Sequence, residues 1–251
     1  MTYQEKLQLF SDLCYENKNT QEIMDIMKIT RKTLNNYEKC LGIKCAKNIR
    51  MPKLDVNFFE NIDNEYKAYI LGFIAADGYI ESNERTLTFN INKKDIDILY
   101  KIKDVVSCEN DIKNSSTKDC VRLYLSSIKL VNDLKKYHIC KNKTFDMFMP
   151  ILREDLYRHY WRGYFDGDGH IGKRQCALVI GSHQMFDDFM HLMKEQFDME
   201  LYFIHKHNYY QIQFNRRDAE IIKWLYKDSH IFLNRKYKSY VDNWANYTPK
   251  G

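Results

Sequence analysis

Two aspartates at the ends of similar apolar segments are the residues in this chain best suited to chemistry. Asp77 follows residues 68–76, and Asp168 follows residues 160–167; a glycine comes after each aspartate. Each segment has small residues four positions apart, a spacing that lets two helices approach closely. These residues are Gly72 and Ala76 in the first segment, and Gly163 and Gly167 in the second. If the two helices pack together, the carboxylates of Asp77 and Asp168 lie side by side, which favours a shared proton or a divalent cation.

The elements predicted around the two aspartates follow the same order. Each copy has an apolar helix ending at Asp-Gly, then two strands, a helix, two strands and a helix, which gives αββαββα. The longer elements of the first copy are predicted at 65–76, 86–92, 95–106, 121–125 and 128–137. Those of the second are predicted at 156–165, 177–180, 185–196, 210–214 and 219–226. The aspartates are 91 residues apart, so the fold class predicted is α+β, with two pseudo-symmetric halves facing each other through their first helices.

The N-terminal residues are predicted to form a small all-α domain. Asn19 can cap a helix over 20–27, with Glu22 in the capping-box position, and Thr30 can cap a second helix over 31–38. This arrangement resembles a helix-turn-helix, whose second helix enters the major groove of DNA. A plain helical hairpin is the alternative.

The second helix of this domain would expose four polar side chains to DNA. They are Arg31, Lys32, Asn35 and Asn36. The turn departs from the usual helix-turn-helix pattern at Lys28, where glycine is common. The predicted domains are a helix-turn-helix at 1–44, a linker at 45–57, a first repeat at 58–150 and a second repeat at 151–251.

Composition and charge narrow the class of protein and its partner. The net charge is +5, and residues 1–53 hold ten Lys and Arg against six Asp and Glu, so a basic N-terminal module favours a polyanionic partner. The longest apolar run is too short to span a membrane, and the chain is expected to be intracellular. The seven cysteines are scattered, and we interpret them as reduced packing residues.

At its two Asp-Gly segments the chain resembles the LAGLIDADG homing endonucleases, in their single-chain, two-repeat form. The resemblance covers about residues 58–245, because each Asp-Gly heads the same order of elements and each copy closes with a basic motif. It implies two αββαββα repeats packed through their LAGLIDADG helices, and a monomer that cleaves double-stranded DNA.

The basic motifs provide candidate catalytic residues. In the family, a lysine at this position lies beside the scissile phosphates, and the matching residues here are Lys143 and Lys236. The family also places a polar residue, often glutamine, at the end of the strand after Asp-Gly. Here those positions are interpreted as Lys93 and His183, which could orient water or a phosphate.

The resemblance also implies a metal site. Mg²⁺ prefers few carboxylates together with water and substrate oxygens, which suits one aspartate from each repeat. Asp77 and Asp168 would bind the metal, and the backbone carbonyls of Ala76 and Gly167 would complete its shell. Mn²⁺ or Ca²⁺ could substitute for binding. Asp166 has Ala75 as its counterpart in the first copy, and we expect its side chain to face solvent.

Polar strand faces would contact the bases, because amide and guanidinium groups pair with purine edges in the major groove. The candidates in the first repeat are Thr86, Thr88, Asn90, Asn92, Arg122 and Tyr124. Those in the second are Lys173, Arg174, Gln211, Gln213 and Asn215. The alternative is that these residues form the solvent-exposed face of an ordinary sheet packed on helices, which would show the same alternation of polar and apolar residues.

The function that the sequence favours is site-specific, metal-dependent cleavage of both strands of a long, nonpalindromic DNA site. The N-terminal helix-turn-helix would extend the recognised site. One alternative is a transcriptional regulator with the same fold that binds DNA without cutting it. Another is an intron maturase, whose partner would be a structured intron RNA.

Overall fold

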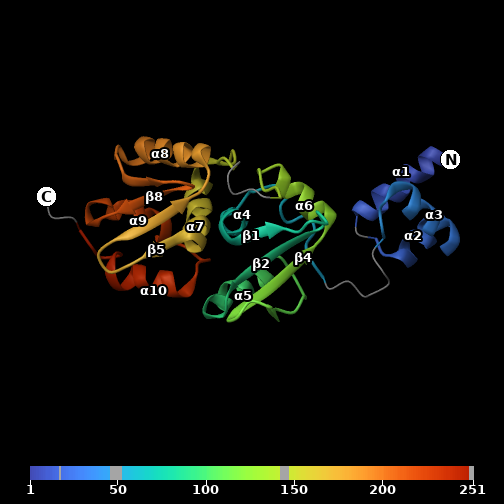
Figure 1. The fold of residues 1–251 in the computed structure, drawn as a ribbon, viewed down its shortest axis with the longest axis horizontal. Coiled ribbons are helices and arrows are strands. Elements are labelled where there is room, and N and C mark those ends of the chain that lie inside the picture. Colours follow the sequence, from blue (N-terminus) through green and yellow to red (C-terminus); the bar gives the residue numbers. More distant parts are fainter. Residues whose placement is uncertain (17, 46–52, 142–146, 249–251) are drawn as a thin grey trace.

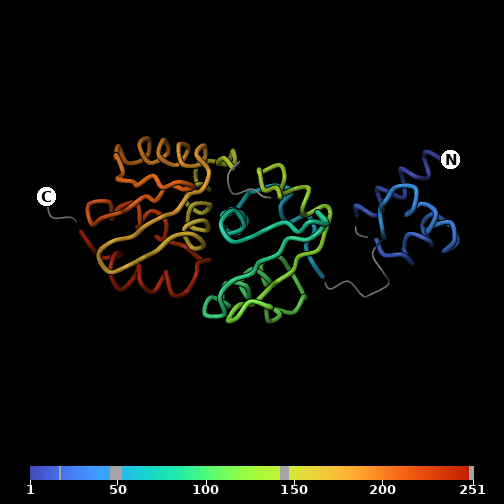
Figure 2. The backbone as a smooth tube through the Cα atoms, viewed as in Figure 1, coloured from blue at the N-terminus to red at the C-terminus, as the bar shows by residue number. Residues whose placement is uncertain are grey.

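The computed structural model describes all residues except 17, 46–52, 142–146 and 249–251, and Figure 1 shows its three parts in a row. A three-helix domain lies at the N-terminal end, the first repeat lies in the middle, and the second repeat lies at the other end. The tube in Figure 2 follows the chain through these parts in that order. The predicted fold class, two αββαββα repeats and a small all-α domain, is confirmed.

The N-terminal domain consists of helices α1 (Tyr3–Tyr15), α2 (Thr20–Met27) and α3 (Arg31–Leu41). The predicted caps are confirmed: Asn19 and Glu22 form a capping box on α2, and the Thr30 side chain accepts a hydrogen bond from the Thr33 N–H. Lys28 ends α2 in the left-handed conformation (φ 51°), so lysine adopts the backbone that glycine usually provides in this turn. Helix α1 was not predicted, and its Leu7 and Phe10 supply part of the core of this domain.

The first repeat is a four-stranded antiparallel sheet with helices. Its sheet has the order β1-β2-β4-β3. Its elements are α4 (Glu65–Asp77), β1 (Gly78–Ile80), β2 (Thr86–Asn92), a 3-10 turn η1 (Lys93–Asp95), α5 (Ile96–Val105), β3 (Lys113–Asn114), β4 (Cys120–Ser126) and α6 (Ile128–Lys135).

The second repeat has the same sheet order, β5-β6-β8-β7. Its elements are η3 (Glu154–Leu156), α7 (Tyr157–Asp168), β5 (Gly169–Ile171), β6 (Cys176–Ile180), α8 (His183–Phe197), β7 (Tyr202–Lys206), β8 (Tyr209–Phe214), η4 (Arg216–Asp218), α9 (Ala219–Tyr226) and α10 (Asn234–Asn243). Helix α10 extends the predicted repeat, and it begins at the basic motif that closes the second copy.

The hydrophobic core runs through both repeats. The alternating residues Leu87, Phe89 and Ile91 of β2 are buried, as their period of two predicts, and α4 and α7 lie between the two sheets (Figure 1). Helix α4 is apolar on all sides because it packs against α7 as well as its own sheet. No helix among the described residues has the length and hydropathy needed to cross a membrane.

Polar contacts also join the two repeats. The Arg235 guanidinium donates to both carboxylate oxygens of Asp95 (2.5 and 3.0 Å), and the Lys101 Nζ donates to the Phe232 carbonyl (2.6 Å). The backbone N–H of Asn234 donates to Asp97 (3.1 Å). The start of α10 is therefore held against η1 and α5 of the other repeat.

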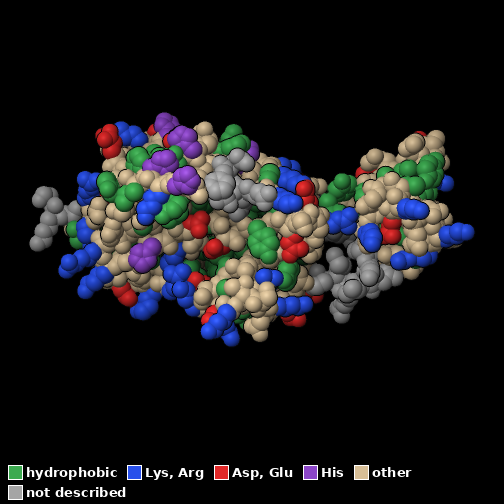
Figure 3. Space-filling model, in the orientation of Figure 1, with side chains coloured by type: hydrophobic (Ala, Val, Ile, Leu, Met, Phe, Trp, Pro, Cys, Tyr) green, Lys and Arg blue, Asp and Glu red, His purple; other side chains and the backbone are tan. Residues whose placement is uncertain are grey.

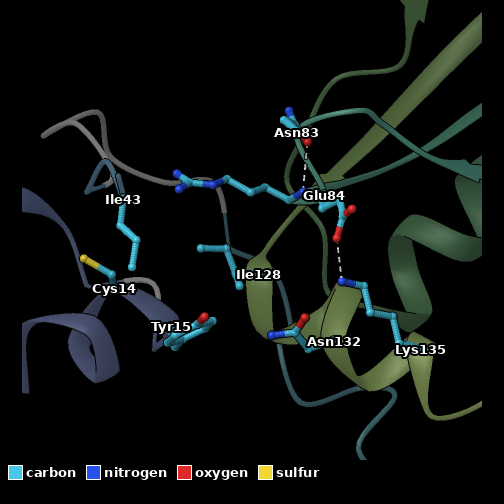
Figure 4. A pocket seen from close by; sticks show the side chains of 9 residues that line it. Cys14, Tyr15, Ile43, Asn83, Glu84, Ile128, Asn132 and Lys135 are labelled. Atoms are coloured by element: carbon cyan, nitrogen blue, oxygen red, sulfur yellow. Dashed lines mark hydrogen bonds and ion pairs between the residues drawn. The ribbon is translucent and has the colours of Figure 1, made fainter. Parts of the chain in front are cut away.

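The N-terminal domain faces the first repeat across a cavity of about 180 Å³ (Figure 4). Tyr15 and Ile43 line it from one side and Ile128 and Asn132 from the other. The Arg85 guanidinium donates to the Lys44 carbonyl (3.0 Å). No residue of α3 itself lines this cavity, and Arg31, Lys32, Asn35 and Asn36 are exposed.

Candidate active site

The crossing of α4 and α7 depends on two glycines. A Cβ built on Gly72 would lie 1.8 Å from the Tyr160 carbonyl oxygen, and one on Gly163 would lie 1.9 Å from the Tyr69 carbonyl oxygen. Each glycine therefore faces the backbone of the opposite helix, where no side chain fits. The predicted packing of the two apolar helices is confirmed.

This crossing brings Asp77 and Asp168 to the same end of the helix pair. A Cβ on Gly167 would lie 2.3 Å from the Ala76 Cβ and 3.2 Å from Asp77 Oδ2, so the Asp77 carboxylate lies against the last turn of α7. Asp168 is the final residue of α7. On the face shown in Figure 3, acidic side chains gather at the junction of the two repeats and basic side chains lie around the edge.

The donors at this position fit a hard divalent cation. Among the described residues, no group of three or more His, Cys, Asp or Glu could hold a metal ion. A cation here would depend on the two aspartates and on the backbone carbonyls of Ala76 and Gly167, with water and DNA oxygens as further ligands. This set is compatible with Mg²⁺, which keeps several waters and needs only one or two carboxylates.

Lys236, near the start of α10, reaches the end of α7. Its Nζ donates to the carbonyls of Phe165 and Asp166 (2.7 Å each) and of Gly167 (3.3 Å), and its side chain is 1% exposed. Burial lowers the pKa of Lys236 to about 8, although Asp166, Asp77 and Asp168 attract the charged form. The ammonium thus stabilises the end of the helix that carries Asp168. The matching Lys143 lies outside the described residues.

Asp166 does not face solvent, so that expectation was wrong. Its carboxylate is 1% exposed and accepts hydrogen bonds from the hydroxyls of Tyr69 (2.7 Å) and Tyr226 (2.6 Å) and from the Leu233 N–H (2.7 Å). Burial raises the pKa of Asp166, and the Lys236 ammonium and the three donors act in the opposite sense. Asp166 therefore ties α7 to α4, α9 and the segment before α10.

A second buried group on α7 lies one turn earlier and was missed in the sequence. The Arg162 guanidinium donates to the carbonyls of Leu225 and Ile231 (3.0 Å each) and to Glu65 of α4 (2.9 Å). Its Nη1 also meets His159 Nδ1 (2.9 Å), and burial lowers the pKa of His159 to about 4. An arginine inside an apolar helix was the signal that could have revealed this network.

Lys93 directly follows β2, whereas His183 is the first residue of α8, three residues after the end of β6, and the two are not equivalent. Gly78 pairs with Phe89 in the first sheet, and the equivalent Gly169 pairs with Leu178 in the second. Equivalent residues of β2 and β6 are therefore 89 residues apart, whereas those of the preceding helices are 91 apart. By this register Lys93 corresponds to Ser182, and the pairing of Lys93 with His183 was wrong by one residue. His183 is 72% exposed, and its Nδ1 meets the Tyr210 hydroxyl (2.9 Å). The role of either residue stays a prediction.

The polar strand faces differ from what the alternation predicted. Thr86 and Thr88 are buried rather than exposed: Thr86 pairs with Ser126, and Thr88 donates to Glu81 (2.9 Å). The remaining strand candidates are at least partly exposed. These are Asn90, Asn92, Arg122, Tyr124, Lys173, Arg174, Gln211, Gln213 and Asn215. Arg122 Nε donates to Asn90 Oδ1 (3.3 Å), so these two act as a unit across β2 and β4.

Comparisons with known proteins agree with this geometry. Residues 155–223 match the model of the LAGLIDADG-like domain. One curated relative, the replication factor C small subunit of Methanocaldococcus jannaschii, is 26% identical over 164 residues, which are 62% of this chain and 9% of that protein. The chain therefore spans only a small part of the length of this relative.

Solved structures with a similar fold include DNA-bound enzymes. The meganuclease I-AabMI bound to uncleaved DNA is 16% identical over 70% of this chain and 88% of its own (TM-score 0.47). The homing endonuclease I-WcaI bound to its DNA recognition sequence is 14% identical over 72% of this chain and 90% of its own (TM-score 0.49). Full-length DUF199/WhiA from Thermatoga maritima is 11% identical over 78% of this chain and 66% of its own (TM-score 0.48).

The match to the LAGLIDADG-like domain lies within the second repeat and extends over α7, its sheet and most of α9. The resemblance seen in the sequence is thereby confirmed. The first repeat, with the same order of elements and the same sheet order, packs on it as a second copy of the fold.

Proposed function

We propose that the protein is a site-specific endonuclease that cleaves both strands of DNA with divalent metal ions. The observation that carries the proposal is the position of the Asp77 carboxylate against the last turn of α7, beside Asp168. Neighbouring carboxylates repel, so two acids brought to the same end of a close helix crossing favour a bound cation. Binding DNA without cutting it does not need them.

In the proposed reaction, each half contributes one aspartate to the metal site. Mg²⁺, when bound, would activate water and neutralise charge on the scissile phosphates. Asp77 and Asp168 would bind the cation, together with the carbonyls of Ala76 and Gly167. Lys236 fixes the Gly167 carbonyl and places positive charge behind the site. Lys143 is the matching residue of the first repeat and stays a candidate catalytic residue on the sequence alone.

The proposed partner is double-stranded DNA, bound by a monomer along both sheets. The partly exposed strand residues would read the bases, and Lys93 and His183 would contact phosphates or water near the site. The helix-turn-helix of residues 1–44 would extend the footprint through Arg31, Lys32, Asn35 and Asn36. In a homing enzyme, the target would be the locus that its own reading frame interrupts.

The test is incubation of the full chain with its genomic locus, rejoined without the insertion, in Mg²⁺. We expect double-strand cuts with short 3′ overhangs. Asp77→Asn and Asp168→Asn should abolish cutting, while binding to the DNA site measured without a divalent cation persists. Asp104→Asn, at an exposed position on α5, is the matched control and should cut like the wild type. Tight specific binding without cutting in Mg²⁺ or Mn²⁺ would refute the proposal.

The helix-turn-helix can be tested separately through the salt dependence of DNA binding. Each phosphate contact contributes about 0.9 to the slope of log K against log salt. Arg31→Ala with Lys32→Ala should therefore lower the slope by about 1.8 if both side chains contact phosphates. Lys6→Ala, an exposed lysine on α1, is the control. An unchanged slope and footprint would exclude α3 from the interface.

One observation favours a second function, a regulator that binds DNA without cutting it. The Lys236 ammonium is surrounded by three backbone carbonyls, so it stabilises the fold whether or not DNA is cut. If the wild type binds one site tightly and never cleaves it, this function replaces the first. Preference for intron RNA over the DNA site would instead indicate a maturase.

A further inference from the structure

A cavity of about 230 Å³ opens beside Asp168 in the second repeat, with room for several water molecules. It lies between α7, the junction of β6 and α8, and the turn between β7 and β8. Its polar lining includes Tyr164, Asp168, Ser182, Asn208 and Tyr209. Ala75 and Ala76 at the end of α4 close it on the side of the first repeat.

Tyr164 is the tyrosine that α7 places nearest to the acids. Its side chain is 4% exposed, and it lies one turn before Asp168 on the same face of the helix. Among the residues that the structure describes, its hydroxyl makes no hydrogen bond. Burial raises the pKa of Tyr164 well above its usual value, and the negative charges of Asp168 and Asp77 act in the same direction. A phenol is ordinarily protonated at neutral pH, so this hydroxyl can donate a hydrogen bond.

The first repeat has no such hydroxyl. The repeat length of 91 residues makes Phe73 the counterpart of Tyr164, and Phe73 is fully buried against Phe89 (ring centroids 5.9 Å apart). The same position in the same fold is therefore filled by phenylalanine in one half and tyrosine in the other. Packing at this position requires the ring only, so the additional hydroxyl of Tyr164 points to another role.

We propose that the Tyr164 hydroxyl donates a hydrogen bond to a non-bridging oxygen of one scissile phosphate, the one that enters the cavity beside Asp168. This rests on the proposed DNA-binding site, and it makes Tyr164 a catalytic residue for one strand only. A neutral donor in a partly buried cavity stabilises phosphate charge without adding a proton acceptor. The other strand, on the Phe73 side, is cut without this contact.

The first experiment is Tyr164→Phe on a target duplex with a different fluorophore on each strand. Single-turnover cleavage of one strand should slow by about ten- to a hundredfold, the range for a hydrogen bond to a charged group. The other strand should change less than twofold. Tyr160→Phe is the matched control, because its hydroxyl meets the Met185 sulfur (3.9 Å) and does not line the cavity. Equal slowing of both strands, or of neither, would overturn the proposal.

A binding measurement tests the same contact without catalysis. In Ca²⁺, a methylphosphonate placed at the scissile phosphate of one strand removes its charge, and affinity is measured for wild type and Tyr164→Phe. On one strand the two changes should be non-additive, because both remove the same contact. Additive losses on both strands would overturn the proposal even if the wild type cuts DNA. If the wild type binds but does not cut, non-additive losses would still establish the phosphate contact while the endonuclease proposal fails.

Discussion

Replacing Gly72 with alanine tests the helix crossing on which the candidate site depends. The new Cβ would lie 1.8 Å from the Tyr160 carbonyl oxygen, whereas ordinary contact of a Cβ begins at 3.4 Å. The backbone of α7 cannot rotate away as a side chain could. The two helices would therefore have to separate by about 1.6 Å, unless the backbone of one of them bends.

The size of the effect follows from two opposing contributions. Alanine in a helix interior is favoured over glycine by about 1 kcal/mol. A separation of this size loses much of the van der Waals contact along the crossing, since a gap of 0.5–1 Å already forfeits about a quarter to a half of it. We expect a net loss of about 3–5 kcal/mol, similar to creating a cavity in a core. For a chain of this length, that lowers the melting temperature by at least about 6 °C.

Thermal and urea unfolding of Gly72→Ala measure this loss. Gly163→Ala should behave alike, because its Cβ would lie 1.9 Å from the Tyr69 carbonyl oxygen. Gly42→Ala is the control: no atom lies within 4 Å of its Cβ, and only its positive φ opposes the change, at about 1–2 kcal/mol. If Gly72→Ala were as stable as the wild type, or gained the 1 kcal/mol of helix propensity, the helices would not cross this closely.

Two further predictions concern the buried groups on and near α7. Asp166→Ala leaves the hydroxyls of Tyr69 and Tyr226 without their acceptor and should lower the free energy of unfolding in urea by about 3–5 kcal/mol. The control Asp187→Ala, at an exposed position, should lower it by less than about 0.5 kcal/mol. A loss below about 1 kcal/mol for Asp166→Ala would contradict the hydrogen-bond network. Burial lowers the pKa of Lys236 from 10.5 to about 8, so between these pH values the folded state binds fewer protons than the unfolded state. The free energy of unfolding should therefore rise with pH in that window, by up to about 1.4 kcal/mol per pH unit. Unfolding at pH 7.5, 8.5 and 9.5 should show this rise in the wild type relative to Lys236→Met, and equal slopes would contradict it.

The elements of the fold were predictable where a local signal specified them. The period of two in β2, the caps of α2 and α3, and the glycine spacing in α4 and α7 each depend on residues close in sequence. Helix α1 was missed even though Thr2 and Glu5 form a capping box at its start. The repeat was visible because both copies retain the same pattern.

The environment of the site residues was less predictable, because it depends on distant partners. The hydroxyls that bind Asp166 lie 97 and 60 residues away, and nothing near Asp166 in the sequence indicates them. Thr88 is buried and donates to Glu81 in the turn of the same β1–β2 hairpin, which strand alternation does not reveal. The pairing of Lys93 with His183 was wrong because the loop of the first hairpin is two residues longer than that of the second. Equivalent positions are therefore 91 residues apart in the helices but 89 apart in the strands that follow.

The two repeats share a backbone but not the polar groups around the acids. Arg162, Tyr164 and Asp166 of α7 have Leu71, Phe73 and Ala75 as counterparts on α4. Arg162 and Asp166 lie four apart, so they share the face of α7 that packs on α9 and the segment before α10. Asp168 is therefore carried by a helix end fixed by buried charges, whereas Asp77 is carried by an apolar helix. Two carboxylates in such different surroundings differ in how firmly they are held, so the two strands of a bound duplex would meet unequal sites. If the protein cleaves DNA as proposed, this asymmetry suits a nonpalindromic target and predicts different cutting rates for the two strands.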